Sequence, residues 1–326
     1  MVVYPANAQH LGSRKEQQDA FGISDLSDTT FISHGGGLAV VADGMGGLAE
    51  GGKASSLAVK TFLEAYARKS PKETIEDALD RAILETNEAV HSLAAELEQE
   101  GNCGTTLVAA VLHDSGLFWI YAGDSRIYLT DGQALQLLTE DQVYGRRLDQ
   151  AADRGLIDPE TAQLHPERES LTSYIGDERI NEIGRGFLPG PLPAGASVLL
   201  CTDGLFKFLP EERIIGTYIQ YPAEWVGKLV ETVIGEKLPG QDNVTAVCLH
   251  IGQVRPALKK TATRRKWLAL IVISLCALVA GAVFLVHQTR QFPLGSSEPI
   301  LSVPSADTMP TSTDKAPKGV SGDGMP

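Results

Sequence analysis

Through residues 1–254, short apolar runs alternate with longer segments in which apolar residues recur every three or four positions. Short runs bounded by turn residues predict strands, whereas the spacing of three and four predicts helices. The predicted strands are Leu38–Ala42, Leu107–Leu112, Leu117–Tyr121, Arg126–Leu129, Ser197–Cys201 and Val244–His250. The predicted helices are Gly52–Lys69, Thr74–Gln99 and Glu224–Val233, with Pro71 between the first two. Because the strands come in hairpins and the helices in pairs, the pattern predicts an α+β fold.

The pattern changes after residue 254. Residues 255–266 form a basic linker, and Trp267–Val286 is an apolar stretch of about 20 residues, long enough at ~1.5 Å per residue to cross a bilayer. The bases that precede the stretch are Lys259, Lys260, Arg264, Arg265 and Lys266, whereas only Arg290 follows closely. This asymmetry predicts a single-pass protein of the plasma or inner membrane with its N-terminal domain in the cytoplasm. Residues 287–326, rich in Pro, Ser and Thr, are predicted to be a disordered tail.

The charge of the chain and its cysteine spacing argue against some classes of function. Acidic residues outnumber basic ones by 41 to 28. Four of these acids and eight of the bases lie from Lys259 onward, which leaves 37 acids and 20 bases before it. Such an acidic domain repels nucleic-acid phosphates, so the sequence argues against nucleic acid as a partner. The four cysteines are Cys103, Cys201, Cys248 and Cys276. They show no Cys-x-x-Cys spacing, so we interpret them as reduced thiols that pack in apolar surroundings.

Four aspartates stand at the edges of apolar or Gly-rich segments. They are Asp19, Asp43, Asp203 and Asp242. A carboxylate at such an edge is held by a stiff element and faces an opening. If several converge, they repel one another unless hard cations such as Mg²⁺ or Mn²⁺ neutralise them, and the lack of His or Cys nearby argues against zinc. The pattern therefore favours a two-metal hydrolytic centre.

The phrases around these aspartates recur in a known order. They are Arg14-Lys-Glu-Gln-Gln-Asp19, Val40-Val-Ala-Asp43-Gly-Met-Gly-Gly47, Gly104-Thr105-Thr106, Ala122-Gly-Asp124-Ser-Arg126, Leu138-Thr-Glu-Asp141, His165-Pro-Glu-Arg168, Leu199-Leu-Cys-Thr-Asp203-Gly and Gly240-Gln-Asp242-Asn-Val-Thr. Each phrase alone is a weak signal. Together, from about Gly12 to about Leu249, they resemble the metal-dependent serine/threonine phosphatases of the PPM (PP2C) family in its bacterial form.

The resemblance implies a fold and a reaction. It implies that residues 1–254 form a sandwich of two antiparallel β-sheets flanked by helix pairs, with metal ions at one edge of the sandwich. It further implies water-driven hydrolysis of phosphoserine and phosphothreonine with two, or with a third site three, Mn²⁺ or Mg²⁺ ions. The implied partners are phosphorylated proteins and a bacterial serine/threonine kinase. The irregular segment Gln142–Gly186 corresponds to the family's flap beside the active site.

The resemblance also gives individual residues a role. Asp43 is the carboxylate that bridges two ions, with the Gly44 carbonyl as a further ligand. Asp203 and Asp242 complete the first metal site, and Asp19 lies near the second ion, often through water. Two further roles complete the implied site: Asp124 for a third, weaker metal and Arg14 for the substrate phosphate. An arginine suits that task because its planar guanidinium binds two phosphate oxygens at once.

Four positions depart from the family pattern. Gln17 stands where relatives often carry Asn, and Gln142-Val143 where many have His-Ser. Met45 occupies the place of a histidine proposed as general acid in animal relatives, so the donor of the leaving-group proton is unassigned: a metal-bound water is one option, and His165 is a distant outsider. None of these departures removes a metal aspartate.

Two alternative functions remain open from the residues. Gly47–Lys53 follows a strand and opens a predicted helix, almost as in a phosphate-binding loop, but Ala54 stands where the Mg²⁺-binding hydroxyl is required. A non-catalytic, membrane-tethered module that binds phosphoproteins is the second alternative, although such modules usually lose metal aspartates. A cysteine-based phosphatase is excluded, since no arginine stands six residues after Cys103 or Cys201.

Overall fold

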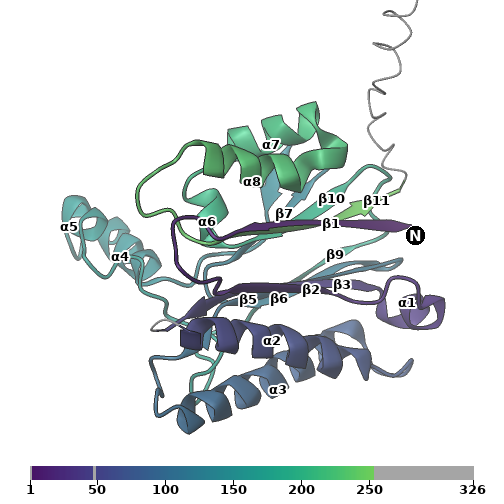
Figure 1. Ribbon diagram of the computed structural model, residues 1–326, viewed down its shortest axis with the longest axis horizontal. Coiled ribbons are helices and arrows are strands. Elements are labelled where there is room, and N and C mark those ends of the chain that lie inside the picture. Colours follow the sequence, from purple (N-terminus) through teal and green to yellow (C-terminus); the bar gives the residue numbers. More distant parts are fainter. Residues whose placement is uncertain (1, 47–48, 253–326) are drawn as a thin grey trace, which may run out of the picture. The chain divides into compact units, whose positions relative to one another are not determined.

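The computed structural model describes residues 2–46 and 49–252, within a compact unit that spans residues 1–259. Two antiparallel β-sheets form its centre (Figure 1). In spatial order the first sheet contains β1 (Val3–His10), β11 (Val244–Ile251), β10 (Ser197–Cys201), β7 (Arg126–Thr130) and β8 (Leu135–Leu137). The second contains β2 (Asp19–Ile23), β3 (Gly37–Met45), β5 (Leu107–His113), β6 (Gly116–Ala122) and β9 (Gly184–Pro189), and the short β4 (Gly104–Thr105) pairs with β3.

Helix pairs cover the outer face of each sheet, as Figure 1 shows. The second sheet is covered by α2 (Ala49–Ala67) and α3 (Ile75–Glu96), and the first by α7 (Glu211–Gln220) and α8 (Trp225–Gly235). The shorter helices are α1 (Thr29–Gly35), α4 (Tyr144–Asp153), α5 (Pro159–Gln163), α6 (Asp203–Phe206) and the 3₁₀ turn η1 (Pro222–Glu224). The α+β sandwich of two antiparallel sheets implied by the resemblance is therefore confirmed for the described residues.

The core consists of three apolar layers, and β3 shows why. Its residues Ala39 and Val41 face the other sheet, whereas Leu38 and Val40 face α2 and α3. A strand buried on both faces reads as a continuous apolar run instead of an alternating one. The layer between the first sheet and its helices is centred on the fully buried Trp225.

Not every element follows the predicted pattern. The four edge strands β1, β2, β8 and β9 were not predicted, because all but one of their side chains are at least partly exposed and give no apolar run. The segment Gln142–Gly186 was predicted to be irregular, but it contains α4 and α5. These helices are short and bury few side chains, so their helical periodicity is weak.

Three predicted segments lie outside the described residues: the basic linker 255–266, the membrane span 267–286 and the tail 287–326. Within residues 2–46 and 49–252, no helix is long and apolar enough to span a membrane.

Candidate metal centre

The strand pairing brings the four predicted aspartates to one end of the sandwich. Asp19 opens β2 and is paired in register with Asp43 near the end of β3. Asp203 follows β10 by two residues, and Asp242 precedes β11 by two residues. Because β10 and β11 are antiparallel neighbours, these two aspartates also lie at a common end of their sheet. Each sheet thus contributes two carboxylates.

Two threonines join these ends across the gap between the sheets. The hydroxyl groups of Thr202 and Thr245, at the ends of β10 and β11, donate hydrogen bonds to Asp19 Oδ2 at 2.9 and 2.7 Å. Asp19 belongs to the other sheet, so this carboxylate is fixed by residues 183 and 226 positions away in the chain. Neither threonine was singled out from the sequence, because Thr in a strand is an ordinary packing residue.

Asp19 and Asp124 are buried, the other three carboxylates are partly buried, and all five are close enough to perturb one another. Burial raises the pKa of Asp43 well above its ordinary value, and the charges of four other carboxylates raise it further. These are Asp19, Asp203, Asp124 and Asp242. Burial likewise raises the pKa of Asp19 to about 6 and that of Asp124 to about 7. The structure therefore gathers all five predicted aspartates into one electrostatic cluster.

Unpartnered oxygens in this cluster test whether it suits a metal ion. Asp19 Oδ1 and Asp203 Oδ1 are both buried and have no hydrogen-bond partner within the described part of the chain. Buried carboxylate oxygens without donors are costly unless a cation compensates them. The cluster offers only oxygen atoms as metal ligands, and oxygen ligands match Mg²⁺ or Mn²⁺ better than zinc. The residues therefore fit hard divalent cations.

The carboxylates do not, however, converge on one point. Among residues 2–46 and 49–252, no three His, Cys, Asp or Glu side chains are drawn together closely enough to hold an ion. Their oxygens engage protein donors instead: Asp242 pairs with Arg14 at 2.6 Å, and Asp203 with Lys207 at 2.8 Å. Asp203 and Asp242 are thus each paired with a cation of the protein itself.

Gly44 is required where β3 meets α2. A Cβ atom on Gly44 would lie 2.0 Å from the Gly51 carbonyl oxygen and 2.7 Å from that of Gln18. Only glycine permits this approach, which sets the peptide after Asp43 against both neighbouring segments. The part of Gly47–Lys53 that is described, from Ala49 on, is the first turn of α2 packed on β3, which differs from an open phosphate-binding loop.

The loop that carries Arg14 is held against the loop of Asp242. Asn243 contacts both loops. Its backbone N–H donates to Asp242 Oδ1 at 2.8 Å, whereas its side chain binds the Arg14 loop through the carbonyls of Leu11 and Glu16 and the N–H of Gln18. Asn243 therefore positions the segment that delivers Arg14 and Asp19.

The flap segment Gln142–Gly186 contacts the turn that carries Asp124. The buried Gln142 accepts a hydrogen bond from the Gly123 N–H at 2.8 Å. Arg126 donates to both carboxylate oxygens of Asp141, at 2.9 and 2.7 Å, and its guanidinium lies 3.8 Å above the Phe206 ring. Gln142, which departs from the family pattern, thus shapes this turn. His165 instead contacts the Tyr144 ring in the flap.

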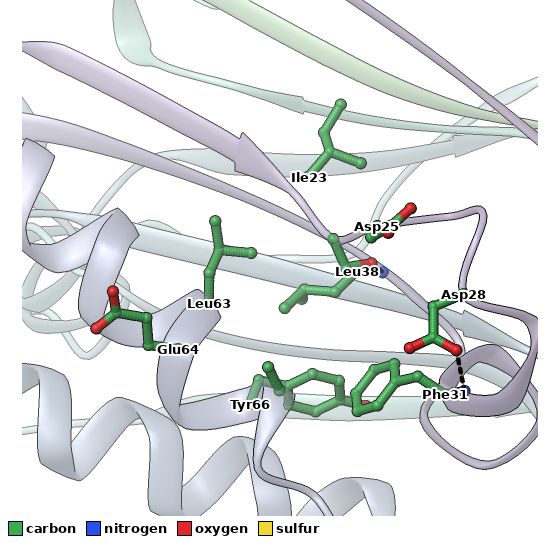
Figure 2. Close-up of a pocket in the computed structure, with 10 residues that line it drawn as sticks. Ile23, Asp25, Asp28, Phe31, Leu38, Leu63, Glu64 and Tyr66 are labelled. Carbon is green, nitrogen blue, oxygen red and sulfur yellow. Dashed lines mark hydrogen bonds between the residues drawn. The ribbon is translucent and has the colours of Figure 1, made fainter.

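Two cavities flank different ends of the sandwich. A cavity of about 590 Å³ adjoins the aspartate cluster and includes Asp124 and Lys207 in its wall. A separate cavity of about 360 Å³ is lined by Leu38, Leu63, Tyr66 and others, as Figure 2 shows. It lies at the Ile23 end of β2, opposite the Asp19 end, so it is not part of the carboxylate cluster.

Comparison with known proteins agrees with this fold and identifies the family. Residues 7–238 match the protein phosphatase 2C family. The chain is 36% identical over 205 residues to the serine/threonine phosphatase stp of Listeria monocytogenes, which covers 62% of this chain and 77% of that protein. The crystal structure of the Mycobacterium tuberculosis serine/threonine phosphatase PstP/Ppp has a TM-score of 0.61 and 28% identity, and the match covers 78% of this chain and 100% of that one.

A further solved structure contains metal. It is the catalytic domain of the serine threonine protein phosphatase PstP in complex with 2 manganese ions, with a TM-score of 0.59 and 26% identity over 77% of this chain and 99% of that one. The family match spans well over half of the chain and includes every residue of the cluster except Asp242. The chain therefore belongs to the protein phosphatase 2C family, which confirms the resemblance drawn from its motifs and makes it a protein phosphatase.

Proposed function

We propose that this chain hydrolyses phosphoserine and phosphothreonine in proteins, using water activated at a centre of two Mn²⁺ or Mg²⁺ ions. The observation that carries the proposal is the cluster of buried and partly buried aspartates where the ends of the two sheets are joined, with the buried, unpartnered oxygens of Asp19 and Asp203. The names of the relatives and the two manganese ions of PstP support the same reaction.

In this proposal Asp43 would hold both ions, with the Gly44 carbonyl as a further ligand. Asp203 and Asp242 complete the first site, and Asp19 serves the second. When bound, such ions lower the pKa of coordinated water and neutralise charge on the phosphoryl oxygens. The chain holds its carboxylates ready for them: Thr202 and Thr245 fix Asp19 across the two sheets.

Arg14 binds the phosphate group of the substrate in this proposal. Its side chain is 52% exposed and contacts Asp242, so it stands at the edge of the cluster with donors that can reach an incoming substrate. The guanidinium orients the phosphate and stabilises the charge that develops on it. No protein nucleophile is required, because water attacks the phosphorus directly.

A direct assay tests the reaction. The full-length chain should release phosphate from a phosphothreonine peptide and from p-nitrophenyl phosphate when Mn²⁺ is present, and a chelator should abolish the release. Activity that persists in excess chelator would contradict the metal mechanism. Inactivity with every divalent ion would favour the non-catalytic module that binds phosphoproteins.

The cellular setting is a second part of the proposal. The apolar stretch Trp267–Val286 and the bases before it support a single-pass membrane protein whose phosphatase domain faces the cytoplasm. There the domain acts on phosphorylated proteins and opposes a serine/threonine kinase. The acidic surface of the domain disfavours nucleic acid as a partner.

A labelling experiment tests this topology. In intact cells a cysteine introduced as Ser305→Cys should react with a membrane-impermeant thiol reagent, whereas Cys276 should be shielded by lipid. A chain truncated near Leu258 should stay in the soluble fraction and remain active, because β11 ends at Ile251. If the Ser305→Cys variant is labelled only after lysis, the orientation is the reverse of the one proposed.

A further inference from the structure

Lys207 places an ammonium group beside the candidate metal centre. It follows Asp203 by one helical turn at the end of α6, and its Nζ donates to Asp203 Oδ2 at 2.8 Å. The same Nζ lies 3.3 Å from Glu169 Oε2 in the flap segment. Lys207 and Asp124 also line the same cavity, and the charge of Lys207 lowers the pKa of Asp124 against the larger effect of burial. One ammonium therefore pairs with two carboxylates and shares a cavity wall with a third.

This lysine carries its charge at neutral pH. Its Nζ lies within ion-pair distance of two carboxylates, Asp203 and Glu169, and such partners favour the protonated form of a lysine. The neighbouring Arg126 is engaged elsewhere, because its guanidinium binds Asp141 through two hydrogen bonds and stacks on a phenylalanine ring. The positive charge close to Asp124 and Asp203 thus comes from Lys207.

The hydrogen bond from Lys207 leaves the two carboxylate oxygens of Asp203 in different surroundings. Oδ2 accepts the hydrogen bond from Lys207, whereas Oδ1 is buried and has no hydrogen-bond partner within the described residues. Oδ1 is thus available to an ion shared with Asp43. A second ion approaching Oδ2 from the side of Asp124 would have to displace the ammonium and overcome its repulsion.

We propose that Lys207 is a built-in cation that takes the place of a third metal ion between Asp124 and Asp203, so that the centre works with two ions. This inference rests on the proposed function, because it presumes that Asp43 and its neighbours bind the other two. A fixed charge at this position neutralises Asp124 without an ion that must be recruited from solution. It also makes the third site insensitive to the concentration of divalent cations.

Calorimetric titration of the full-length chain with Mn²⁺ tests the inference. The unmodified chain should bind two ions. Lys207→Met, which nearly keeps the length of the side chain but removes its charge, should bind a third ion at Mn²⁺ concentrations at which the unmodified chain binds only two. Lys207→Arg should return the stoichiometry to two. The matched control is Lys228→Met, since Lys228 pairs with Glu231 on α8, away from the cluster, and should leave the titration unchanged.

A double variant identifies the site of the third ion. Adding Asp124→Asn to Lys207→Met should remove the third ion, whereas Asp124→Asn alone should leave two. If Lys207→Met does not fold, as judged by circular dichroism, Lys207→Gln takes its place. Three ions in the unmodified chain, or two in a folded Lys207→Met or Lys207→Gln variant, would overturn the inference. Binding of no ions, or binding that Asp43→Asn leaves intact, would instead contradict the proposed function.

Discussion

Asp43→Asn is expected to lower kcat by about 10³-fold or more, which corresponds to roughly 4 kcal/mol of transition-state stabilisation. The substitution removes the anionic ligand that both ions share in the proposed centre. Because the side chain keeps its shape, the fold should be retained. Phosphate release from a phosphothreonine peptide under saturating Mn²⁺ measures the effect, and Asp203→Asn and Asp242→Asn should behave alike.

Thermal unfolding separates loss of metal from loss of fold. In the metal-free protein, burial and neighbouring carboxylates already favour the neutral form of Asp43, so Asp43→Asn should leave the melting temperature unchanged or raise it. At about 100 times its dissociation constant, Mn²⁺ should stabilise the unmodified chain by about 2.7 kcal/mol, and the variant should lose most of this gain. The control is Asp80→Asn, an exposed carboxylate on α3 that pairs with Arg185. An Asp43→Asn variant with unchanged Mn²⁺ affinity and stoichiometry would show that Asp43 is not a ligand.

Arg14→Ala is expected to lower kcat/KM by about 10²-fold, because the phosphate loses a bidentate, charge-assisted contact. Arg14→Lys should recover little, since an ammonium group cannot reproduce the planar fork. Steady-state kinetics on a phosphothreonine peptide measures both variants. Lys15→Ala, at the exposed neighbouring position, is the matched control and should retain full activity.

The same variants should leave metal binding nearly intact. The ion pair between Arg14 and Asp242 is half exposed, and exposed pairs contribute only about 0–1 kcal/mol. Its loss should therefore change the Mn²⁺ dissociation constant by no more than about fivefold. Full activity in either Arg14 variant would refute the phosphate role. A large loss of Mn²⁺ affinity with an unchanged KM would assign Arg14 to the support of Asp242 instead.

The sequence by itself determined the central strands and most of the candidate site. β3, β5, β6, β10 and β11 were predictable because burial on both faces leaves an uninterrupted apolar run. Asp43 and Asp203 were recognisable because each ends such a run and is followed by glycine. These signals depend only on residues that are close together in the sequence, so the sequence alone is enough to detect them.

Only the tertiary structure decided how these pieces meet. The pairing of Asp19 with Asp43 depends on the register of β2 against β3, and the contacts of Thr202 and Thr245 with Asp19 join two different sheets. Nothing in the neighbourhood of a threonine in the sequence records a partner about 200 residues away, because such contacts follow from strand order and packing. The same holds for Lys207. Its spacing from Asp203 can be read from the sequence, but its position near Asp124 and Glu169 exists only in the folded chain.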